Sequence, residues 1–255
     1  MSFLGIRRPT LLWATKAIHV FIYYAWQPIF FRTQIEVYGT NRIRNFYGNA
    51  VFAANHASEL DFPIIICRAL TIARALRKRL PLISLTREKE FYSDMGFLKA
   101  LLYGGILFRI FGGYPVTPEK ERSTAELRQN TIATHISFLE KGLSVLIFPE
   151  GTITHTGNLS PAKPGVVILS EQAHRPIIPM AIEGTFGLSF ADFLFGRKKV
   201  RVMFGKPIFP MSHMTAHLNF PDKKLLYQTK AQFVMHRIQR MLCALKRIRE
   251  RERRA

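Results

Sequence analysis

The sequence predicts an α/β fold: a layered, largely parallel mixed sheet flanked by helices, with an N-terminal membrane-associated helical segment. Short apolar runs of strand length alternate with stretches of helical periodicity, which is typical of parallel sheets. The chain has 255 residues, 48% of them hydrophobic, which is enough to bury one sizeable core. We therefore expect one large domain at residues 34–220, between an N-terminal anchoring segment at 1–33 and a basic amphipathic helix at 221–255.

The N-terminal segment contains a nearly continuous apolar and aromatic run at residues 11–31, interrupted by Lys16, His19 and Pro28. A lysine in the middle of a spanning helix costs about 2.5–3.5 kcal/mol at the bilayer centre. Arginines stand on both sides of the run, so the positive-inside rule gives no direction. Spanning is thus the strained alternative, and we expect a monotopic helix or bent hairpin on the cytosolic face of a membrane.

The middle of the chain supplies the alternating elements. Strands are expected at residues 35–37, 50–54, 81–86, 143–148, 177–182 and 200–204, and helices at 62–73, 123–140, 165–173 and 223–254. The helix at 123 opens with the capping box Ser123-Thr124-Ala125-Glu126. Pro179 inside a strand indicates an edge position or a bend. The apolar run at 91–111 is either a core helix or a contact for an acyl chain or membrane.

The C-terminal helix carries one apolar stripe and many basic residues. The stripe consists of Val234, Ile238, Met241, Leu245 and Ile248, which recur at helical steps of three and four. Residues 246–254 hold six basic side chains. Two interpretations stay open: a packed terminal helix with a solvated charged face, or a basic amphipathic helix on anionic lipid.

The charge of the chain predicts a partner of negative sign. Subtracting 17 acidic from 37 basic residues gives +20. Anionic lipid, nucleic acid or an acidic carrier would fit this charge. A mean hydropathy of +0.05 and 21 phenylalanines favour a membrane surface, and nucleic acid is not expected. Cys67 and Cys243 lie far apart in apolar helical patterns, so we expect no disulfide and no metal site, and a reducing, cytosol-facing location.

A histidine and an aspartate follow the apolar run that ends at Ala54. His56 and Asp61 are five residues apart, a spacing that puts them on different faces of a helix, so they can pair only across a turn. In such a turn Asp61 would hold one ring nitrogen of His56, leaving the other to take a proton from a hydroxyl. The simpler alternative is that Asp61 caps the next helix and His56 is an ordinary loop histidine.

A second polar turn follows the predicted strand at 143–148. Phe148 leads directly into Pro149, Glu150, Gly151 and Thr152. An anionic Glu150 would repel a phosphate, so it either accepts hydrogen bonds from acceptor hydroxyls or holds its own loop. The amides of Gly151 and Thr152 and the Thr152 hydroxyl would then face a phosphate or a carbonyl.

The two turns together, Asn-His-x-x-x-x-Asp and then Phe-Pro-Glu-Gly-Thr about 90 residues later, resemble the glycerolipid acyltransferase family, which includes the lysophosphatidic acid acyltransferases. The resemblance covers roughly residues 35–210. It implies that His56 is a general base oriented by Asp61, and that Asn55 is the family's residue before the histidine. It also implies that residues 148–152 bind the acceptor, that Lys163 matches a family Lys-x-Gly, and that the strand of Pro179 is a later motif.

By this resemblance the protein moves a fatty acyl group from a thioester donor, acyl-CoA or acyl carrier protein, to a hydroxyl of a lysophospholipid such as lysophosphatidic acid. It needs no cofactor beyond this co-substrate, and its partners are the lipid acceptor, the donor and an anionic membrane surface. Pro118 and Ile153 stand where the family often places phosphate-binding arginines. The acceptor is therefore alternatively another lysolipid or hydroxylated lipid, and a non-catalytic basic membrane- or nucleic-acid-binding protein is the remaining alternative.

Overall fold

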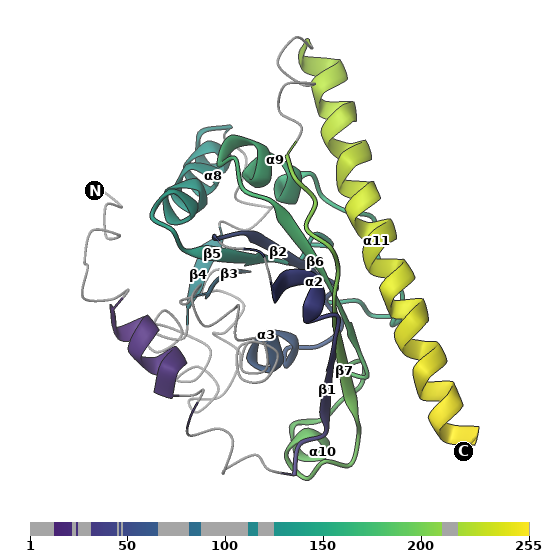
Figure 1. Cartoon of the computed structure of the whole chain (residues 1–255). Helices are drawn as coiled ribbons and strands as arrows, with labels where there is room; N and C mark the ends of the chain where they lie inside the picture. Colours follow the sequence, from purple (N-terminus) through teal and green to yellow (C-terminus); the bar gives the residue numbers. More distant parts are fainter. Residues whose placement is uncertain are drawn as a thin grey trace.

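A seven-stranded sheet organises the part of the chain that the computed structural model describes, namely residues 13–21, 24, 32–44, 46, 48–65, 82–87, 112–116, 125–210 and 219–254. The strands are β1 (Ile35–Tyr38), β2 (Val51–Ala54), β3 (Leu82–Arg87), β4 (Gly113–Val116), β5 (Ser144–Ile147), β6 (Ile177–Glu183) and β7 (Val200–Phe204). Their order across the sheet is β1-β7-β6-β2-β5-β3-β4 (Figure 1). All neighbours pair in parallel except β6 and β7, which confirms a largely parallel mixed sheet.

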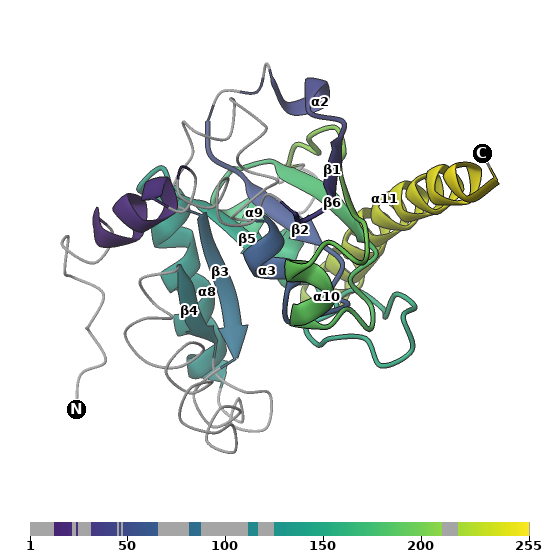
Figure 2. The same cartoon turned by 90° about the horizontal axis from the view of Figure 1, so that it is seen from below.

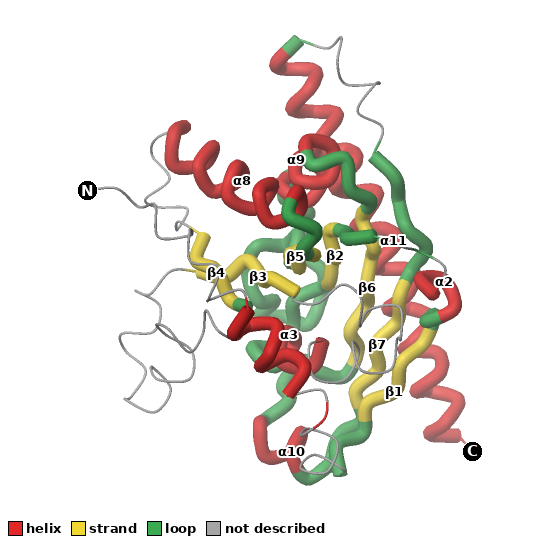
Figure 3. The backbone as a smooth tube through the Cα atoms, turned by 60° about the vertical axis from the view of Figure 1, so that its left-hand side comes forward, coloured by secondary structure: helices red, strands yellow, loops and turns green. Residues whose placement is uncertain are grey.

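Helices cover both faces of this sheet. They are α2 (Asn41–Arg44), α3 (Asp61–Ile64), α8 (Ala125–Glu140), α9 (Gly165–Gln172), α10 (Phe190–Leu194) and α11 (Phe220–Arg254). Along β2, Phe52 and Ala54 join a core cluster with α2, α3 and α10, whereas Val51 and Ala53 join a cluster with α8, α9 and α11. This alternation follows from the two-residue period of a strand. The two helical layers can be followed in Figure 2 and Figure 3.

The C-terminal helix α11 packs on the sheet through its apolar stripe. Val234, Ile238 and Leu245 are almost fully buried in the core cluster that also contains α9. Figure 1 shows the helix running along one side of the molecule, next to β6 and β7. The stripe therefore fits the first of its two interpretations, a packed terminal helix, while the arginines at 237, 240, 247 and 251 are exposed.

Of the two alternatives predicted for the strand of Pro179, an edge position or a bend, one is wrong. An edge position is wrong, because β6 lies between β2 and β7. Ile177 pairs with Ile208, and Met180 pairs with Phe204. Between these two pairs, two residues of β6 lie opposite three residues of the neighbouring segment, so that segment contains one extra residue, a β-bulge. The carbonyl of Pro179 accepts from Gly205 on that side. An N–H at residue 179 would point to the same side as this carbonyl. Proline lacks that N–H, and it is tolerated here because the bulge already interrupts the hydrogen bonds between β6 and its neighbour.

Other predicted elements are described only in part. Of the predicted helix at 62–73, the structure describes the start as α3, and the strand predicted at 81–86 is β3. The capping residues Ser123 and Thr124 and the apolar run at 91–111 lie outside the described residues. Of the N-terminal run, residues 13–21 are helical. Within the described residues, no helix has both the length and the apolar character that crossing a bilayer requires.

Candidate active site

The two polar turns meet because they leave neighbouring parallel strands at the same edge of the sheet. Strands β2 and β5 are adjacent, with Ala53 opposite Ile147. His56 lies three residues beyond Ala53, and Glu150 lies three residues beyond Ile147. The backbone N–H of His56 donates to Oε1 of Glu150 at 2.9 Å, and the carbonyl of His56 accepts from the amide of Thr154 at 2.9 Å. In open α/β sheets, the carboxyl edge of the strands is where ligands bind.

His56 and Asp61 pair across the turn between β2 and α3. Nδ1 of His56 lies 3.0 Å from Oδ2 of Asp61, whose side chain is completely buried. The same Oδ2 accepts from the amides of Ala57 at 2.6 Å and Ser58 at 2.9 Å. Asp61 is the first residue of α3, but its carboxylate turns back to these groups, and α3 has no side-chain cap. With Nδ1 donating to the carboxylate, Nε2 carries the lone pair that can accept a proton.

The ring of Phe148 fixes the plane of the imidazole. The two ring centroids are 4.0 Å apart and the planes differ by 13°. The side chain of His56 is 19% exposed, so the ring is held on one face but is not sealed in the interior. The arrangement can therefore present a base of fixed orientation to a substrate hydroxyl.

Glu150 holds the two loops together. Its Oε1 accepts from the amide of His56, and its Oε2 accepts from the amide of Ser160 at 2.8 Å. Burial raises the pKa of Glu150 above its ordinary value, against the opposing effect of these two amide hydrogen bonds. Of the two roles considered for this residue, the geometry shows the second, because both oxygens bind its own loop and the histidine turn.

Asn55 joins the histidine turn to the end of β6. Its Nδ2 donates to the carbonyl of Ile182 at 3.0 Å, and its Oδ1 accepts from the amide of Ile182 at 2.8 Å. The side chain is buried and satisfies both backbone groups beyond the last β2–β6 pair. Asn55 therefore positions the residue that follows it, and in this structure its amide group binds backbone instead of facing outward.

The rest of the second turn lies around Gly151. Gly151 has a φ of +73°, and a Cβ there would lie 3.0–3.1 Å from the last three side-chain atoms of Lys163. The amide of Lys163 donates to the carbonyl of Pro149 at 2.8 Å. Gly151 therefore allows the lysine side chain to cross the turn. Thr152 is exposed at the end of the turn.

One expectation for this turn is wrong. The amide of Gly151 donates to the carbonyl of Phe148 at 2.9 Å, so it closes the turn and does not face a phosphate or a carbonyl of a ligand. Ile153 is half-buried beside the turn, whereas Pro118 lies outside the described residues.

Sequence reasoning missed the amides of Thr154 and Ser160, which hold His56 and Glu150. These contacts use backbone groups, which every non-proline residue has, so no residue type marks them. The stacking of Phe148 on His56 could have been anticipated, since both residues follow adjacent strands.

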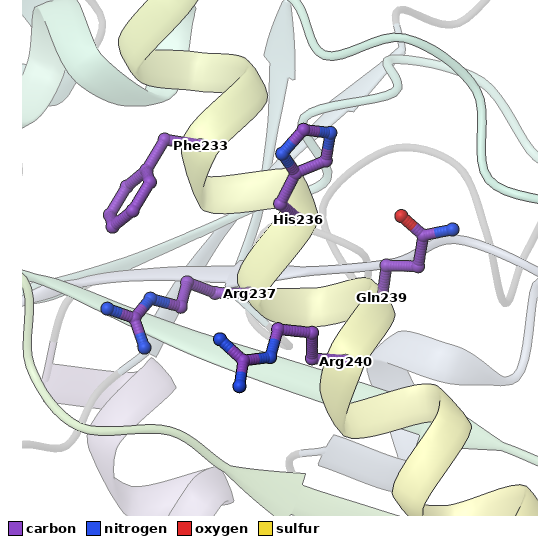
Figure 4. Close-up of a pocket in the computed structure, with 5 residues that line it drawn as sticks. All are labelled: Phe233, His236, Arg237, Gln239 and Arg240. Atoms are coloured by element: carbon purple, nitrogen blue, oxygen red, sulfur yellow. The ribbon is translucent and has the colours of Figure 1, made fainter.

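A surface hollow on α11 lies apart from these residues. It is lined by Phe233, His236, Arg237, Gln239 and Arg240. Figure 4 shows all five side chains extending from one helix. The guanidinium of Arg237 lies over the ring of Phe233, 5.0 Å from its centre. None of the residues at the His56 turn contributes to it. Among the described residues, no three His, Cys, Asp or Glu side chains are grouped as metal ligands would be.

Comparison with known proteins identifies similar sequences and similar folds. A family model described as Acyltransferase matches residues 34–183. A 1-acyl-sn-glycerol-3-phosphate acyltransferase of Limnanthes alba is 28% identical over 151 residues, which are 59% of this chain and 46% of that protein. A chloroplastic 1-acyl-sn-glycerol-3-phosphate acyltransferase of Brassica napus is 25% identical over 200 residues, 76% of this chain and 51% of that protein. The chain thus spans about half the length of these curated relatives.

The fold is similar to the crystal structure of the 1-acyl-sn-glycerophosphate (LPA) acyltransferase PlsC from Thermotoga maritima. The TM-score is 0.56 at 19% sequence identity, and the match covers 96% of this chain and 85% of that one. At this identity, the likeness shows a shared fold.

Proposed function

Because this chain belongs to the acyltransferase family, we propose that it moves a fatty acyl group from a thioester donor to a hydroxyl of lysophosphatidic acid. The observation that carries the proposal is the His56–Asp61 pair at 3.0 Å, on a turn fixed by Glu150 and open to solvent on one side. The names of the curated relatives support this acceptor.

The chemistry follows from the protonation of the pair. Nε2 of His56 takes the proton of the acceptor hydroxyl as its oxygen attacks the thioester carbonyl. Asp61 stabilises the imidazolium that results and keeps Nδ1 protonated. The carbon–sulfur bond then breaks, and the departing thiolate takes the proton from Nε2. The acyl group passes directly between substrates, so no covalent enzyme intermediate forms.

Lys163 and Thr152 are the residues we assign to the acceptor phosphate. The side chain of Lys163 passes over Gly151, so that a Cβ on Gly151 would lie 3.1 Å from Nζ of the lysine. Thr152 is exposed at the same turn. An ammonium and a hydroxyl are suitable phosphate partners. The donor is acyl-CoA or acyl carrier protein, because both are anionic and suit a chain of charge +20.

The proposed location is the cytosolic face of a membrane, reached through the N-terminal segment. In the helix at 13–21, Thr15 and His19 are buried, while Trp13 and Phe21 are exposed, as is Tyr24 just beyond it. The helix therefore turns Thr15 and His19 toward the protein, and its aromatic residues and Lys16 outward, an arrangement that suits the interface of a bilayer.

The test is turnover by the purified full-length chain. The protein is incubated with acyl-CoA or acyl-loaded carrier protein and a panel of lysolipids, and the products are identified by mass spectrometry. We expect His56→Ala and Asp61→Asn to lower turnover at least about 100-fold without unfolding the protein. His155→Ala is the matched control, because His155 is an exposed histidine on the neighbouring loop and should leave turnover unchanged. Full turnover by His56→Ala would refute the mechanism.

The acceptor panel also tests a second candidate. Ile153 follows the Glu-Gly-Thr turn where a phosphate-binding arginine is common in the family, which favours another lysolipid or hydroxylated lipid as acceptor. Preference for a lysolipid without a terminal phosphate would replace lysophosphatidic acid with that acceptor.

A further inference from the structure

Three exposed phenylalanines surround the short helix α10, which connects β6 to β7. Phe186, Phe190 and Phe195 are 51%, 58% and 52% exposed. Because β7 runs antiparallel to β6, the connection lies at the carboxyl edge of β6, the edge where β2 and β5 present His56 and Glu150. Three large, half-exposed aromatic side chains within ten residues of one connection indicate an interaction surface.

The α10 connection is built as a firm part of the fold. Phe193 points inward and is buried in the same core cluster as Leu60 and Ile64, which flank Asp61. Helices α3 and α10 lie near each other in Figure 1, Figure 2 and Figure 3. The side chain of Ser189 caps α10 by accepting from the amide of Asp192 at 3.0 Å. The outward phenylalanines are therefore presented by a fixed element.

Phe186 also touches the loop that carries the second polar turn. A Cβ on Gly157 would lie 3.1 Å from Cδ1 of Phe186, so the ring packs directly on the backbone of that loop. Gly157 follows Thr154, whose amide holds the carbonyl of His56. Phe186 is thus in contact with the loop whose Thr154 amide holds the His56 turn.

The end of the N-terminal segment enters the domain at the same place. A Cβ on Gly196 would lie only 2.0 Å from the carbonyl oxygen of Arg32, so the two backbones are in close contact. Arg32, where the N-terminal segment ends, therefore lies next to the residue that follows Phe195.

The charge around this group fits an anionic surface. Arg197 and Lys198 have side chains that are 64% and 48% exposed, and they outnumber the nearby Asp192. The guanidinium of Arg197 lies 5.5 Å from the ring centre of Phe195. Aromatic rings with adjacent cations are typical of proteins that insert into the interface of an anionic bilayer.

We propose that Phe186, Phe190 and Phe195, here called the α10 aromatic surface, insert into the interface of an anionic lipid bilayer as a second membrane contact. This contact holds the exposed side of His56 toward the bilayer, so that a lipid acceptor reaches Nε2 without passing through water. The inference rests on the proposed function for its lipid substrate, but the contact itself can be measured without turnover.

The first experiment places a fluorescent reporter in the α10 aromatic surface of the full-length chain. The native Trp13 and Trp26 are replaced by Phe, and then Phe190→Trp is compared with Phe209→Trp. Phe209 is a matched control because it is 63% exposed and follows Ile208, which pairs with the amino end of β6 at the opposite edge of the sheet. The probe is a vesicle of phosphatidylcholine and phosphatidylglycerol, with or without bromine on the acyl chains.

We expect brominated lipid to quench Phe190→Trp and to leave Phe209→Trp unquenched. Equal quenching of both reporters, or none at Phe190→Trp, would overturn the proposal. A fluorescence shift that depends on protein concentration without lipid would identify a second copy of the chain as the occupant instead, and would also overturn it.

The second experiment removes the aromatic surface. The triple variant Phe186→Ser, Phe190→Ser and Phe195→Ser should lower the partition coefficient onto these vesicles about tenfold or more, since each ring contributes apolar area. Phe209→Ser should leave the partition coefficient unchanged. Turnover should fall with acceptor embedded in vesicles and stay unchanged with a soluble short-chain lysolipid. Equal loss with both acceptors would contradict the membrane role.

The two proposals fail in different ways. If no lysolipid is acylated but Phe190→Trp is still quenched, the proposed function fails and the membrane contact stands. If lysolipid is acylated and the reporter is not quenched, the membrane contact fails alone.

Discussion

At the scale of single residues, Glu150 connects the two turns of the candidate site. Its carboxylate accepts from the amides of His56 and Ser160, so it acts on the histidine through the backbone. This arrangement accounts for an anion near the place where a phosphate would bind: the charge is buried, and hydrogen-bond donors surround it.

Glu150→Gln should therefore lower kcat more than it changes the KM for the acceptor. A glutamine side chain has one oxygen acceptor and one donor amide, so one of the two backbone N–H groups loses its partner. We expect kcat to fall roughly 10- to 100-fold, the range in which a mispositioned general base matters. Steady-state kinetics at varied acceptor concentration provide the measurement.

Glu59→Gln is the matched control for this prediction. Glu59 is exposed on the turn between His56 and Asp61, so both kinetic constants should stay the same. A large rise in KM with an unchanged kcat for Glu150→Gln would show that Glu150 binds the acceptor hydroxyls directly.

The residues of the site differ in how far the sequence predicts them. The spacing of His56 and Asp61 predicted that any pairing would cross a turn, but it left open whether Asp61 pairs with His56 or caps the next helix; the structure shows the pair. The sequence did not predict that the Gly151 amide would donate its hydrogen bond to the carbonyl of Phe148. That bond depends on the backbone conformation of the turn, which the residue types alone do not determine.

At the level of elements, an ionic cluster with a buried centre at Arg201 and Glu183 joins α11 to three strands. Arg201 on β7 is almost completely buried and binds Glu183 on β6 at 3.2 Å and Glu252 on α11 at 2.6 Å. Its Nε lies 3.1 Å from Glu36 on β1. Burial alone would lower the pKa of Arg201, but its hydrogen bonds and the nearby acidic charges raise it above the ordinary value.

Arg201→Met should destabilise the fold by about 3–5 kcal/mol, because it leaves Glu183 buried with one of its two cations missing. Arg197→Met is the matched control. Arg197 is 64% exposed and 3.7 Å from Asp192, so its loss should change the free energy of unfolding by no more than about 0.5 kcal/mol. Urea unfolding of both variants measures the difference. Similar unfolding free energies for the two variants would mean that the cluster does not stabilise the packing of α11.

Much of the sheet could be predicted from local patterns, whereas contacts between elements could not. Short apolar runs marked β1, β2, β3, β5, β6 and β7, because strands packed in a core are rich in apolar residues, whereas no strand was predicted at β4. Pro179 suggested an edge strand, but β6 is an interior strand. A proline shows only that one hydrogen bond between neighbouring strands is absent. The packing of α11 depended on surfaces remote in sequence, including the strand that carries Arg201.

At the scale of the whole molecule, the sheet separates two kinds of surface. One helical layer, with α8, α9 and α11, buries the stripe of the C-terminal helix and exposes its arginines. The other layer, with α3 and α10, lies beside the candidate active site. The N-terminal helix adds exposed aromatic residues. In the location proposed above, a membrane contacts the protein through its N-terminal segment and the α10 aromatic surface, because the stripe of α11 is buried.

Replacing the outward aromatic residues of the N-terminal segment should release the protein from membranes. Trp13→Ser, Phe21→Ser and Tyr24→Ser together keep Thr15 and His19, whose burial docks the helix, and remove only exposed rings. The loss of this apolar area should move the protein into the soluble fraction when membranes are washed with carbonate at high pH. A chain that begins at Thr33 should behave in the same way. Phe233→Ser, at an exposed position on α11, should stay with the membranes like the unchanged chain. Equal extraction of the triple variant and the unchanged chain would show that the N-terminal segment is not the anchor.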